Sequence, residues 1–419
     1  MCRATAVLAA LALGVATPQP GAAQTEQTRG DARIAWRSSF KTSALASRLP
    51  DDPVLYPDRH TAAGFWRLRF EPTVRVTDNA TVEVAFEQRL RVLSSTSGAV
   101  GAGVLPAGAD PPFRVRPLDW QVASSDRTQW RAEIDRAAFH ARAGAAELVL
   151  GRQAIGWGRG VLFSAVDLFA PFTPLEADRE WRRGVDAVRA DVKLSDRASV
   201  DAVGAFGADV GHSVFAARLR GYAERADVEL VGGRRARDLF GGLTSSAALG
   251  NAEVHAELAV FRTPAVPNSA GYGSDRSVVK AVAGGSYRFA LGNGVLVYGE
   301  YHYSGFGAPS ADGILPLLAD PAFGERYLRG DTQILGRHAL AVLAFYELSP
   351  VVSYSVQWLQ SPVDGSGVLV PSSTFTLSDR VSMLLSGYVP YGAKPVGPML
   401  QSQFGASPLS ALFQLRIYR

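Results

Sequence analysis

The sequence of 419 residues has one cysteine, Cys2, close to its first residue. One positive charge, the short apolar run 4–16 and small residues before Gln24 form the pattern of a secretory signal peptide. We therefore expect residues 1–23 to be cleaved and residues 24–419 to form a single domain that has no cysteine. This excludes disulfides, thiolate metal sites and a cysteine nucleophile.

Long hydrophobic runs are also lacking. After Gln24 no run approaches the roughly 18 uncharged apolar residues that a membrane-spanning helix requires, so a helical membrane protein is excluded. Lysine occurs only at Lys41, Lys193, Lys280 and Lys394, and arginine carries nearly all the positive charge at a net charge of +4. We attribute this bias to composition first. No linker or charge block marks a second domain.

A two-residue alternation is the strongest feature that the sequence does have. It runs from Phe65 to Val92 around a turn at 77–80 and indicates two strands of ten or more residues. In the first strand the apolar face comprises Trp66, Leu68, Phe70, Val74 and Val76, and the polar face Arg67, Arg69, Glu71, Thr73 and Arg75. Soluble strands average about 5–6 residues, whereas about 9–11 tilted residues cross a bilayer, and an inward charged row needs a wet lumen. The pattern predicts a membrane barrel.

Turn residues divide the rest of the chain into further strands. The predicted fold is all-β, a transmembrane antiparallel β-barrel of 18 strands, or 16 if the weak segments 33–40 and 240–248 are not strands. The expected strands are 33–40, 64–76, 81–93, 129–142, 146–156, 184–194, 198–206, 213–222, 227–237, 240–248, 252–262, 278–290, 294–305, 333–346, 351–360, 371–377, 381–389 and 410–418. Pro72 inside a strand removes one ladder hydrogen bond.

The connections alternate between tight turns and long loops, which is the layout of outer-membrane barrels. The expected long loops are 41–63, 94–128, 157–183, 263–277, 306–332, 361–370 and 390–409. We therefore expect a bacterial, Gram-negative outer membrane as the location and its lipid as a partner. The last strand, 411–419, resembles the signal read by the outer-membrane assembly machinery, although it ends in Arg419. A large soluble all-β protein is the alternative reading.

One segment points to a particular group of barrels. Gly151-Arg152-Gln153 ends a strand, Trp157-Gly158 follows, and an aromatic, proline-bearing loop with acidic and arginine residues continues to Asp186. This segment resembles outer-membrane porins of the alginate-export type, over about 40 residues plus the strand pattern. The resemblance implies a loop that folds inward and packs or narrows the lumen. The residues that it implies are Arg152, Trp157, Asp167, Arg179 and Arg183.

Two interpretations of the basic residues stay open. In the first, loop arginines pair with nearby carboxylates and only hold the loop in shape. The residues concerned are Arg179, Arg182 and Arg183 with Glu176, Asp178, Glu180 and Asp186. In the second, an inward basic row makes the lumen favour anions. The row comprises Arg67, Arg69, Arg75, Arg89, Arg91, Arg189 and Lys193, with Arg234, Arg235 and Arg237. Carboxylates share these faces, namely Glu71, Glu83, Glu87, Asp191 and Glu229, so the balance leans only slightly towards anions.

Enzymatic and metal sites have little support in the sequence. The six histidines are scattered without a two-ligand spacing, and only His302 with Ser304 shares one strand face as a local catalytic pair. The glycines at 156–160 lack the ending of a phosphate-binding loop. We therefore expect no catalysis, no cofactor and no nucleic-acid partner.

The sequence thus predicts a porin-like channel for passive passage of a polar solute or polysaccharide, with a lean towards anions. The loops 157–183 and 306–332 would narrow the lumen. A non-conducting barrel with a binding, adhesion or assembly role is the alternative, and the oligomeric state is open.

Overall fold

The computed structural model describes residues 25–29, 32–52, 56–95, 104–105, 111–264, 277–397 and 399–419. The predicted signal peptide lies outside these residues, so its cleavage stays a prediction. No helix in the described ranges is long and apolar enough to cross a membrane.

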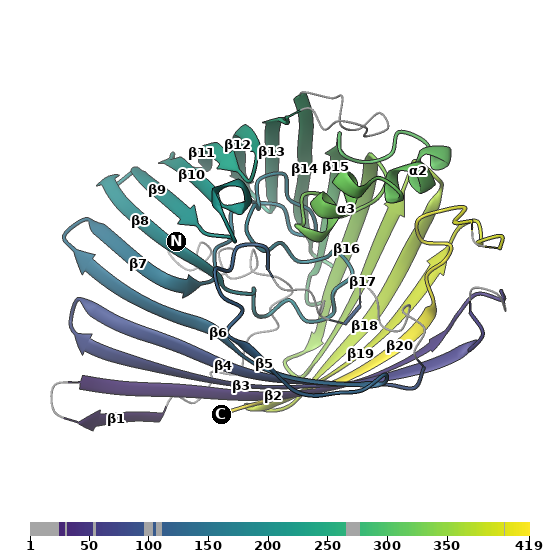
Figure 1. Ribbon diagram of the computed structural model, residues 1–419, viewed down its shortest axis with the longest axis horizontal. Helices are drawn as coiled ribbons and strands as arrows, with labels where there is room; N and C mark the ends of the chain where they lie inside the picture. The colour runs from purple at the N-terminus through teal and green to yellow at the C-terminus, as the bar shows by residue number, and fades with distance from the viewer. Residues whose placement is uncertain are drawn as a thin grey trace.

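Eighteen antiparallel strands form a closed barrel in which each strand pairs with its neighbour along the chain and the last pairs with the first (Figure 1). The strands of the ring are β2 (Ala32–Arg48), β3 (His60–Thr77), β4 (Ala80–Leu93), β6 (Thr128–Ala143), β7 (Ala146–Gln153), β8 (Val185–Ser195), β9 (Ala198–Ala205), β10 (Val214–Tyr222), β11 (Ala226–Arg235), β12 (Asp238–Leu249), β13 (Ala252–Arg262), β14 (Ser277–Phe289), β15 (Val295–Ser304), β16 (His338–Ser349), β17 (Val352–Ser361), β18 (Ser366–Ser378), β19 (Val381–Tyr391) and β20 (Leu409–Tyr418). Closure by β20 and β2 pairs the backbone polar groups that an open edge would expose.

Two further strands lie outside the ring. β1 (Thr25–Arg29) pairs only with β2, and β5 (Asp119–Ser124) pairs only with β6. The connection from β15 to β16 carries the helical segments η2 (Ala311–Gly313), α2 (Ile314–Leu318) and α3 (Pro321–Leu328), and η1 (Val210–His212) joins β9 to β10.

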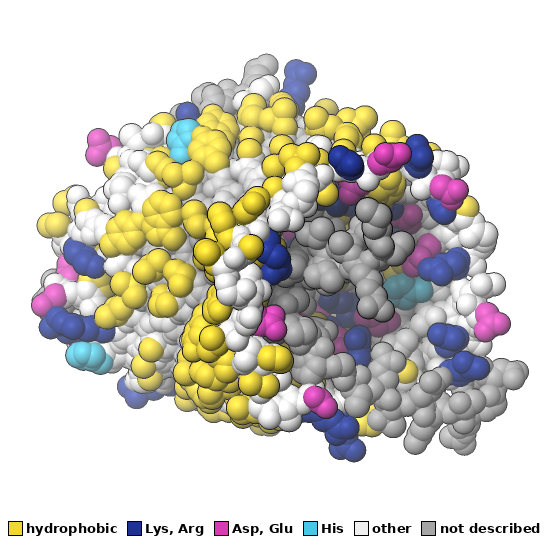
Figure 2. Space-filling model, turned by 180° about the vertical axis from the view of Figure 1, so that it is seen from behind, with side chains coloured by type: hydrophobic (Ala, Val, Ile, Leu, Met, Phe, Trp, Pro, Cys, Tyr) yellow, Lys and Arg dark blue, Asp and Glu magenta, His cyan; other side chains and the backbone are white. Residues whose placement is uncertain are grey.

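The predicted facing of the strands is confirmed. In β3 the Leu68 side chain is 45% exposed and lies on the outer wall, whereas Arg69 is 1% exposed and points inward. The same alternation recurs in β20, where Phe413 is exposed and Gln414 is buried. Apolar side chains accordingly gather on the outside, and charged side chains are visible in the hollow of the barrel (Figure 2).

All the predicted strands exist, including the two weak ones, so the ring has 18 strands and not 16. Three predicted loops are partly wrong. The loop 94–128 contains the short strand β5. β2 continues to Arg48 and β18 begins at Ser366, because small residues such as those in 42–48 carry no bulky alternation yet still pair along the ladder. At Pro72 the pairing of β3 with β4 skips two residues, as expected for a residue without an N–H.

Candidate functional site: a lumen crossed by an inward loop

The longest connection without a strand or helix in its described residues joins β7 to β8 and folds into the barrel. We call residues 154–184 the inward loop. It contacts distant parts of the wall, since the Asp178 carboxylate lies 2.7 Å from Lys41 Nζ on β2, while Glu257 on β13, eight strands away around the ring, accepts a hydrogen bond of 2.8 Å from the Gly160 N–H. The loop therefore crosses the lumen. Gly160 allows its tight path, because a Cβ there would lie 1.9 Å from the Phe163 carbonyl oxygen.

Glu257 on β13 holds the middle of the inward loop. One carboxylate oxygen accepts hydrogen bonds from the backbone N–H groups of Arg159 and Gly160, the latter at 2.8 Å. The other accepts them from Ser164 Oγ at 2.9 Å and from the Ala165 N–H at 2.6 Å. A single wall carboxylate thus satisfies donors that a folded-in backbone would otherwise leave unpaired.

Glu300 on β15 holds the neighbouring residues in the same way. Its carboxylate accepts hydrogen bonds from the N–H groups of Val161, Leu162 and Phe163, the last two at 2.9 and 3.2 Å. His255 Nε2 lies 3.0 Å from the same carboxylate. We call Glu257 and Glu300 the carboxylate clamp. Consecutive N–H groups turned towards one anion form a compact electrostatic anchor.

The first part of the inward loop, residues 155–169, is mostly apolar apart from Arg159 and Asp167, and it packs against the wall. We call it the apolar leg. Trp157 and Phe169 meet edge to face with ring centroids 5.2 Å apart. The wall opposite is apolar as well, and its buried inward side chains include Val185, Val203, Val214, Phe240 and Phe261. At these positions the inner face is apolar and not charged, because the inward loop supplies an apolar partner and removes both surfaces from water. The same strands also carry inward charges, such as Asp201 and Glu229, which pair with Arg218.

The last part of the inward loop, residues 178–184, makes ion pairs with β2, β3 and β6. We call it the ionic leg. Asp178 is bound by Lys41 and by Arg67 at 3.4 Å, and Arg67 also contacts Glu87 at 2.8 Å. Lys41 Nζ lies 3.8 Å from the centroid of the Trp181 ring, a cation–π contact. Burial opposes ionisation of Asp178, but the two cations outweigh it and hold the pKa of this carboxyl below its usual range.

A second cluster of charges continues the ionic leg towards β6. Asp135 accepts hydrogen bonds from Arg69 at 2.8 Å and from the Gly184 N–H at 2.9 Å, and Arg114 reaches it at 3.1 Å. Glu133 pairs with Arg183 of the loop at 2.7 Å. Cations and carboxylates alternate here, so the arginines lie next to compensating negative charge.

The residues implied by the family resemblance lie along the inward loop or at its base. Arg152 is 2% exposed and pairs with Asp186 at 2.7 Å, and Trp157 is buried in the apolar leg. Asp167 pairs with Arg182, whereas Arg179 donates to the carbonyl oxygens of Val161 and Thr173. These contacts fix the loop, and whether the same residues narrow a conducting path stays a prediction.

The remaining predicted residues are spread over the inner wall. Arg67, Arg69 and Arg89 are buried among carboxylates, with Arg89 reaching Glu133 at 2.9 Å. The other five lie further towards the strand ends: Arg75 and Lys193 are exposed, and Arg91, Arg189 and Asp191 are half-buried. Arg189 pairs with Asp201 at 2.9 Å and Lys193 with Asp196 at 2.9 Å. Of the predicted basic row, the structure therefore brings Arg67, Arg69 and Arg89 into the cluster of charges around the ionic leg. The other residues lie outside that cluster. Arg235 is buried and donates to the Leu168 carbonyl oxygen at 2.8 Å.

The loop arginines were expected to pair with carboxylates of the same loop, but in the structure Arg183 and Asp178 have other partners. Arg183 pairs with Glu133 of the wall, and Asp178 pairs with wall cations. These partners lie far away in the sequence, which is why adjacency suggested the wrong pairs. Sequence reasoning also missed Lys41, Trp181 and the carboxylate clamp. Inward carboxylates opposite a long loop rich in glycine are the signal that could have found the clamp.

Comparison with solved structures places this fold among known barrels. Acinetobacter baumannii OccAB3 has a TM-score of 0.57 at 9% identity, covering 92% of this chain and 99% of that one. A. baumannii OccAB4 has a TM-score of 0.55 at 10% identity, covering 94% and 98%, and Pseudomonas aeruginosa OccK11 (OpdR) one of 0.55 at 8% identity, covering 92% and 95%. The fold is that of outer-membrane porins. No family model matches the chain, and no curated protein matches it in sequence.

The suggested catalytic pair does not form in the structure. His302 and Ser304 are both fully buried on the inner face, but neither ring nitrogen nor the serine Oγ has a hydrogen-bond partner in the described ranges. The His302 ring stacks on Phe163 with centroids 4.9 Å apart. Among the described residues no group of three or more His, Cys, Asp or Glu side chains could hold a metal ion.

Proposed function

We propose that this protein is an outer-membrane channel for passive passage of a polar solute, and that the inward loop sets the width of its lumen. One observation carries the proposal: a closed ring of 18 strands is apolar outside and charged inside, and a long loop is anchored across its interior by specific wall carboxylates. A barrel of this size can enclose an aqueous path. A loop anchored across the interior narrows that path.

Location in the bacterial outer membrane follows from the same barrel. Its outer wall carries exposed apolar side chains such as Leu68, Leu230 and Phe413, which water would disfavour and lipid would cover. The resemblance to porins of the alginate-export type is supported by the segment around Arg152 and Trp157, which borders an inward loop. The neighbours in fold are of the Occ and Opd kind.

A preference for anions is part of the proposal and depends on one lysine. Most inward arginines pair with carboxylates, so their charge is locally compensated. Lys280 on β14 is 2% exposed and has no hydrogen-bond or ion-pair partner within the described part of the chain. It lies opposite Ser304, whose hydroxyl also lacks a partner there. Glu257 and Asp167 act on Lys280 electrostatically but form no ion pair with it, so an anionic group that reaches Lys280 and the hydroxyl would supply the missing partner.

A non-conducting barrel with a binding role is the second candidate. The apolar leg favours it, because Trp157, Phe163 and Phe169 are buried against the wall of β8 to β15 and occupy that part of the lumen. If the rest of the lumen were equally filled, the inward loop would act as a plug and function would lie at the surface loops.

Single-channel recording in a planar bilayer separates these candidates. We expect discrete conductance steps and, under a salt gradient, a reversal potential shifted towards anions. Lys280→Met should reduce the anion shift while leaving the steps intact, whereas Lys193→Met, at the exposed end of β8, should change neither. A protein that inserts but stays silent would contradict the channel. Steps without any effect of Lys280→Met would contradict only the anion preference.

A further inference from the structure

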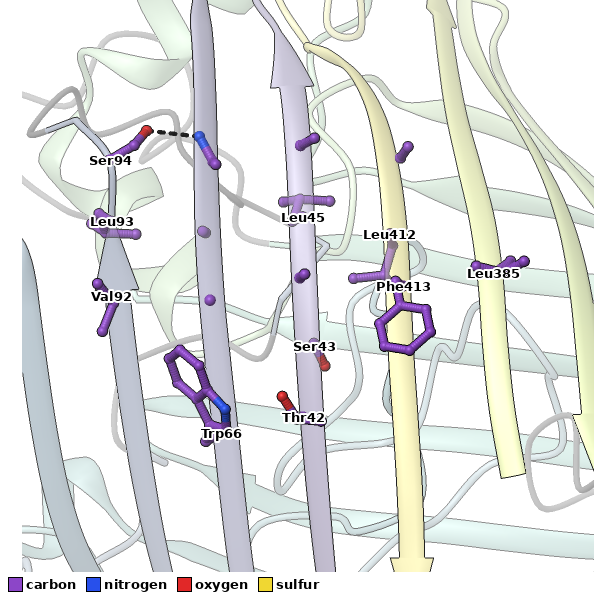
Figure 3. A pocket seen from close by; sticks show the side chains of 16 residues that line it. Thr42, Ser43, Leu45, Trp66, Val92, Leu93, Ser94, Leu385, Leu412 and Phe413 are labelled. Atoms are coloured by element: carbon purple, nitrogen blue, oxygen red, sulfur yellow. Dashed lines mark hydrogen bonds between the residues drawn. The ribbon is translucent and has the colours of Figure 1, made fainter. Parts of the chain in front are cut away.

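A groove lies on the outer wall of the barrel, where β19, β20, β2, β3 and β4 run side by side (Figure 3). Its volume is about 690 Å³, within the range of small-molecule sites. It lies in the half of β2 and β3 nearer the long loops. Small outward residues form its floor, and larger ones flank it. The floor comprises Thr42, Ala44, Ala46, Ala62, Gly64 and Ala411.

The walls of the groove are aromatic and aliphatic side chains. Trp66 stands on one side of β2 and Phe413 on the other, with Leu385 beyond it (Figure 3). The indole of Trp66 lies over Gly64, since a Cβ at this glycine would come within 2.6 Å of a ring carbon. Glycine thus lets the indole lie along the wall, and the lining is apolar enough for a hydrocarbon chain.

Two basic side chains end the groove on the long-loop side. Arg48 pairs with His60 across β2 and β3, two residues beyond the paired Ala46 and Ala62 and on the same outward face. At about 3.3–3.4 Å per residue this places them about 7 Å past the floor. Both are exposed, and neither has a hydrogen-bond or ion-pair partner among the residues that the structure describes. An anion could therefore reach both.

We propose that this groove binds a phosphate-bearing anionic lipid of the outer leaflet, with an acyl chain along the alanine floor and the phosphate at Arg48 and His60. The charge argues against a second copy of the chain as the occupant. A two-fold interface brings identical patches together, so it would place Arg48 and His60 of one copy near those of the other. An acidic headgroup instead complements them.

Native mass spectrometry of the detergent-purified chain tests this site. The protein is mixed with equal amounts of dioleoyl-phosphatidylglycerol and dioleoyl-phosphatidylcholine, and the lipids retained on each copy are counted. We expect phosphatidylglycerol to be retained preferentially. Ala46→Phe fills the floor and should abolish the retained lipid, whereas Ala190→Phe, an outward alanine on β8, should not. Both variants face lipid, so neither is expected to disturb the barrel interior.

The headgroup contact has its own variants. Replacing both Arg48 and His60 by alanine should lower the preference for phosphatidylglycerol about fivefold while phosphatidylcholine is still retained. Arg262→Ala removes another exposed cation at the long-loop end of β13 and should leave the preference unchanged. Equal retention of both lipids by the wild type, or wild-type retention by Ala46→Phe, would overturn the proposal. A dimer or trimer mass that Ala46→Phe removes would assign the groove to a second copy.

Discussion

The two legs of the inward loop contact different parts of the barrel wall by different kinds of interaction. The apolar leg buries Trp157, Phe163 and Phe169 against valines and phenylalanines, whereas the ionic leg places Asp178 and Arg183 among wall charges. Apolar packing is non-directional and tolerates small changes in shape. Buried ion pairs are less tolerant, because removal of one partner leaves the other charge buried and unpaired. The comparison teaches that the ionic leg determines where the loop sits and the apolar leg adds stability.

The largest expected effect is the loss of a charge beneath the ionic leg. Asp135 is 1% exposed and contacts Arg69, Arg114 and the Gly184 N–H. Asp135→Asn should destabilise the folded barrel by about 3–5 kcal/mol, as breaking a buried ion pair usually does. Urea unfolding followed by tryptophan fluorescence measures this loss. Asp209→Asn, at an exposed carboxylate before η1, is the matched control, and an equal loss there would remove the distinction between the sites.

Breaking the carboxylate clamp should have a smaller effect on stability but a visible effect on the lumen. Glu300→Gln keeps the shape and removes the charge that three N–H groups and His255 share. Hydrogen bonds to charged groups contribute about 1.5–3 kcal/mol, so the middle of the inward loop should detach at a comparable cost. Proteolysis at Arg159 and larger conductance steps report detachment.

The control for the clamp is Glu347→Gln, at an exposed carboxylate near the end of β16. It should leave both readouts at the wild-type level. If Glu300→Gln also stays protected at Arg159, Glu257 and the apolar leg together are enough to hold the loop in place.

A change of side-chain shape in the apolar leg should lower the stability of the fold less than Asp135→Asn or Glu300→Gln does. Ile155 is 1% exposed, and Ile155→Val removes one methylene group without leaving a charge unpaired. Such replacements usually cost about 0.5–1.5 kcal/mol. The same urea titration measures the change, with exposed Val351→Ala as the control. A loss as large as that of Asp135→Asn would mean that the apolar leg is as specific as the ionic leg.

The sequence predicted the fold because a barrel wall with lipid on one side requires strands with one apolar face, and the alternation in β3 and β20 shows this pattern directly. It predicted the inward loop by family resemblance, and that Arg69 and Arg89 face inward by alternation. It could not predict what they meet. Arg67 and Asp178 are 111 residues apart, and Ser164 and Glu257 are 93 apart, so only closure of the barrel brings them together. Alternation likewise gives no sign that Val203 and Phe261 pack on a loop instead of facing water.

The two legs should also differ in how they respond to acid. We expect no change in the wild-type protein at neutral pH, and the response to acid distinguishes the two legs directly. Lys41 and Arg67 lower the pKa of Asp178 against the opposing effect of burial, so the folded state prefers the ionised carboxyl. A depressed carboxyl pKa stabilises the fold above the unfolded value of about 3.9, and this contribution is lost as pH falls through the folded value. As pH is lowered, the backbone amides of the ionic leg should therefore lose protection from hydrogen exchange only well below pH 4. They should lose it at a higher pH than the amides of the apolar leg. Asp178→Asn should show fast exchange in 178–184 already at neutral pH and no further acid step. Simultaneous loss of protection in both legs would show that they open as one unit, and the carboxyl would then not act on the ionic leg alone.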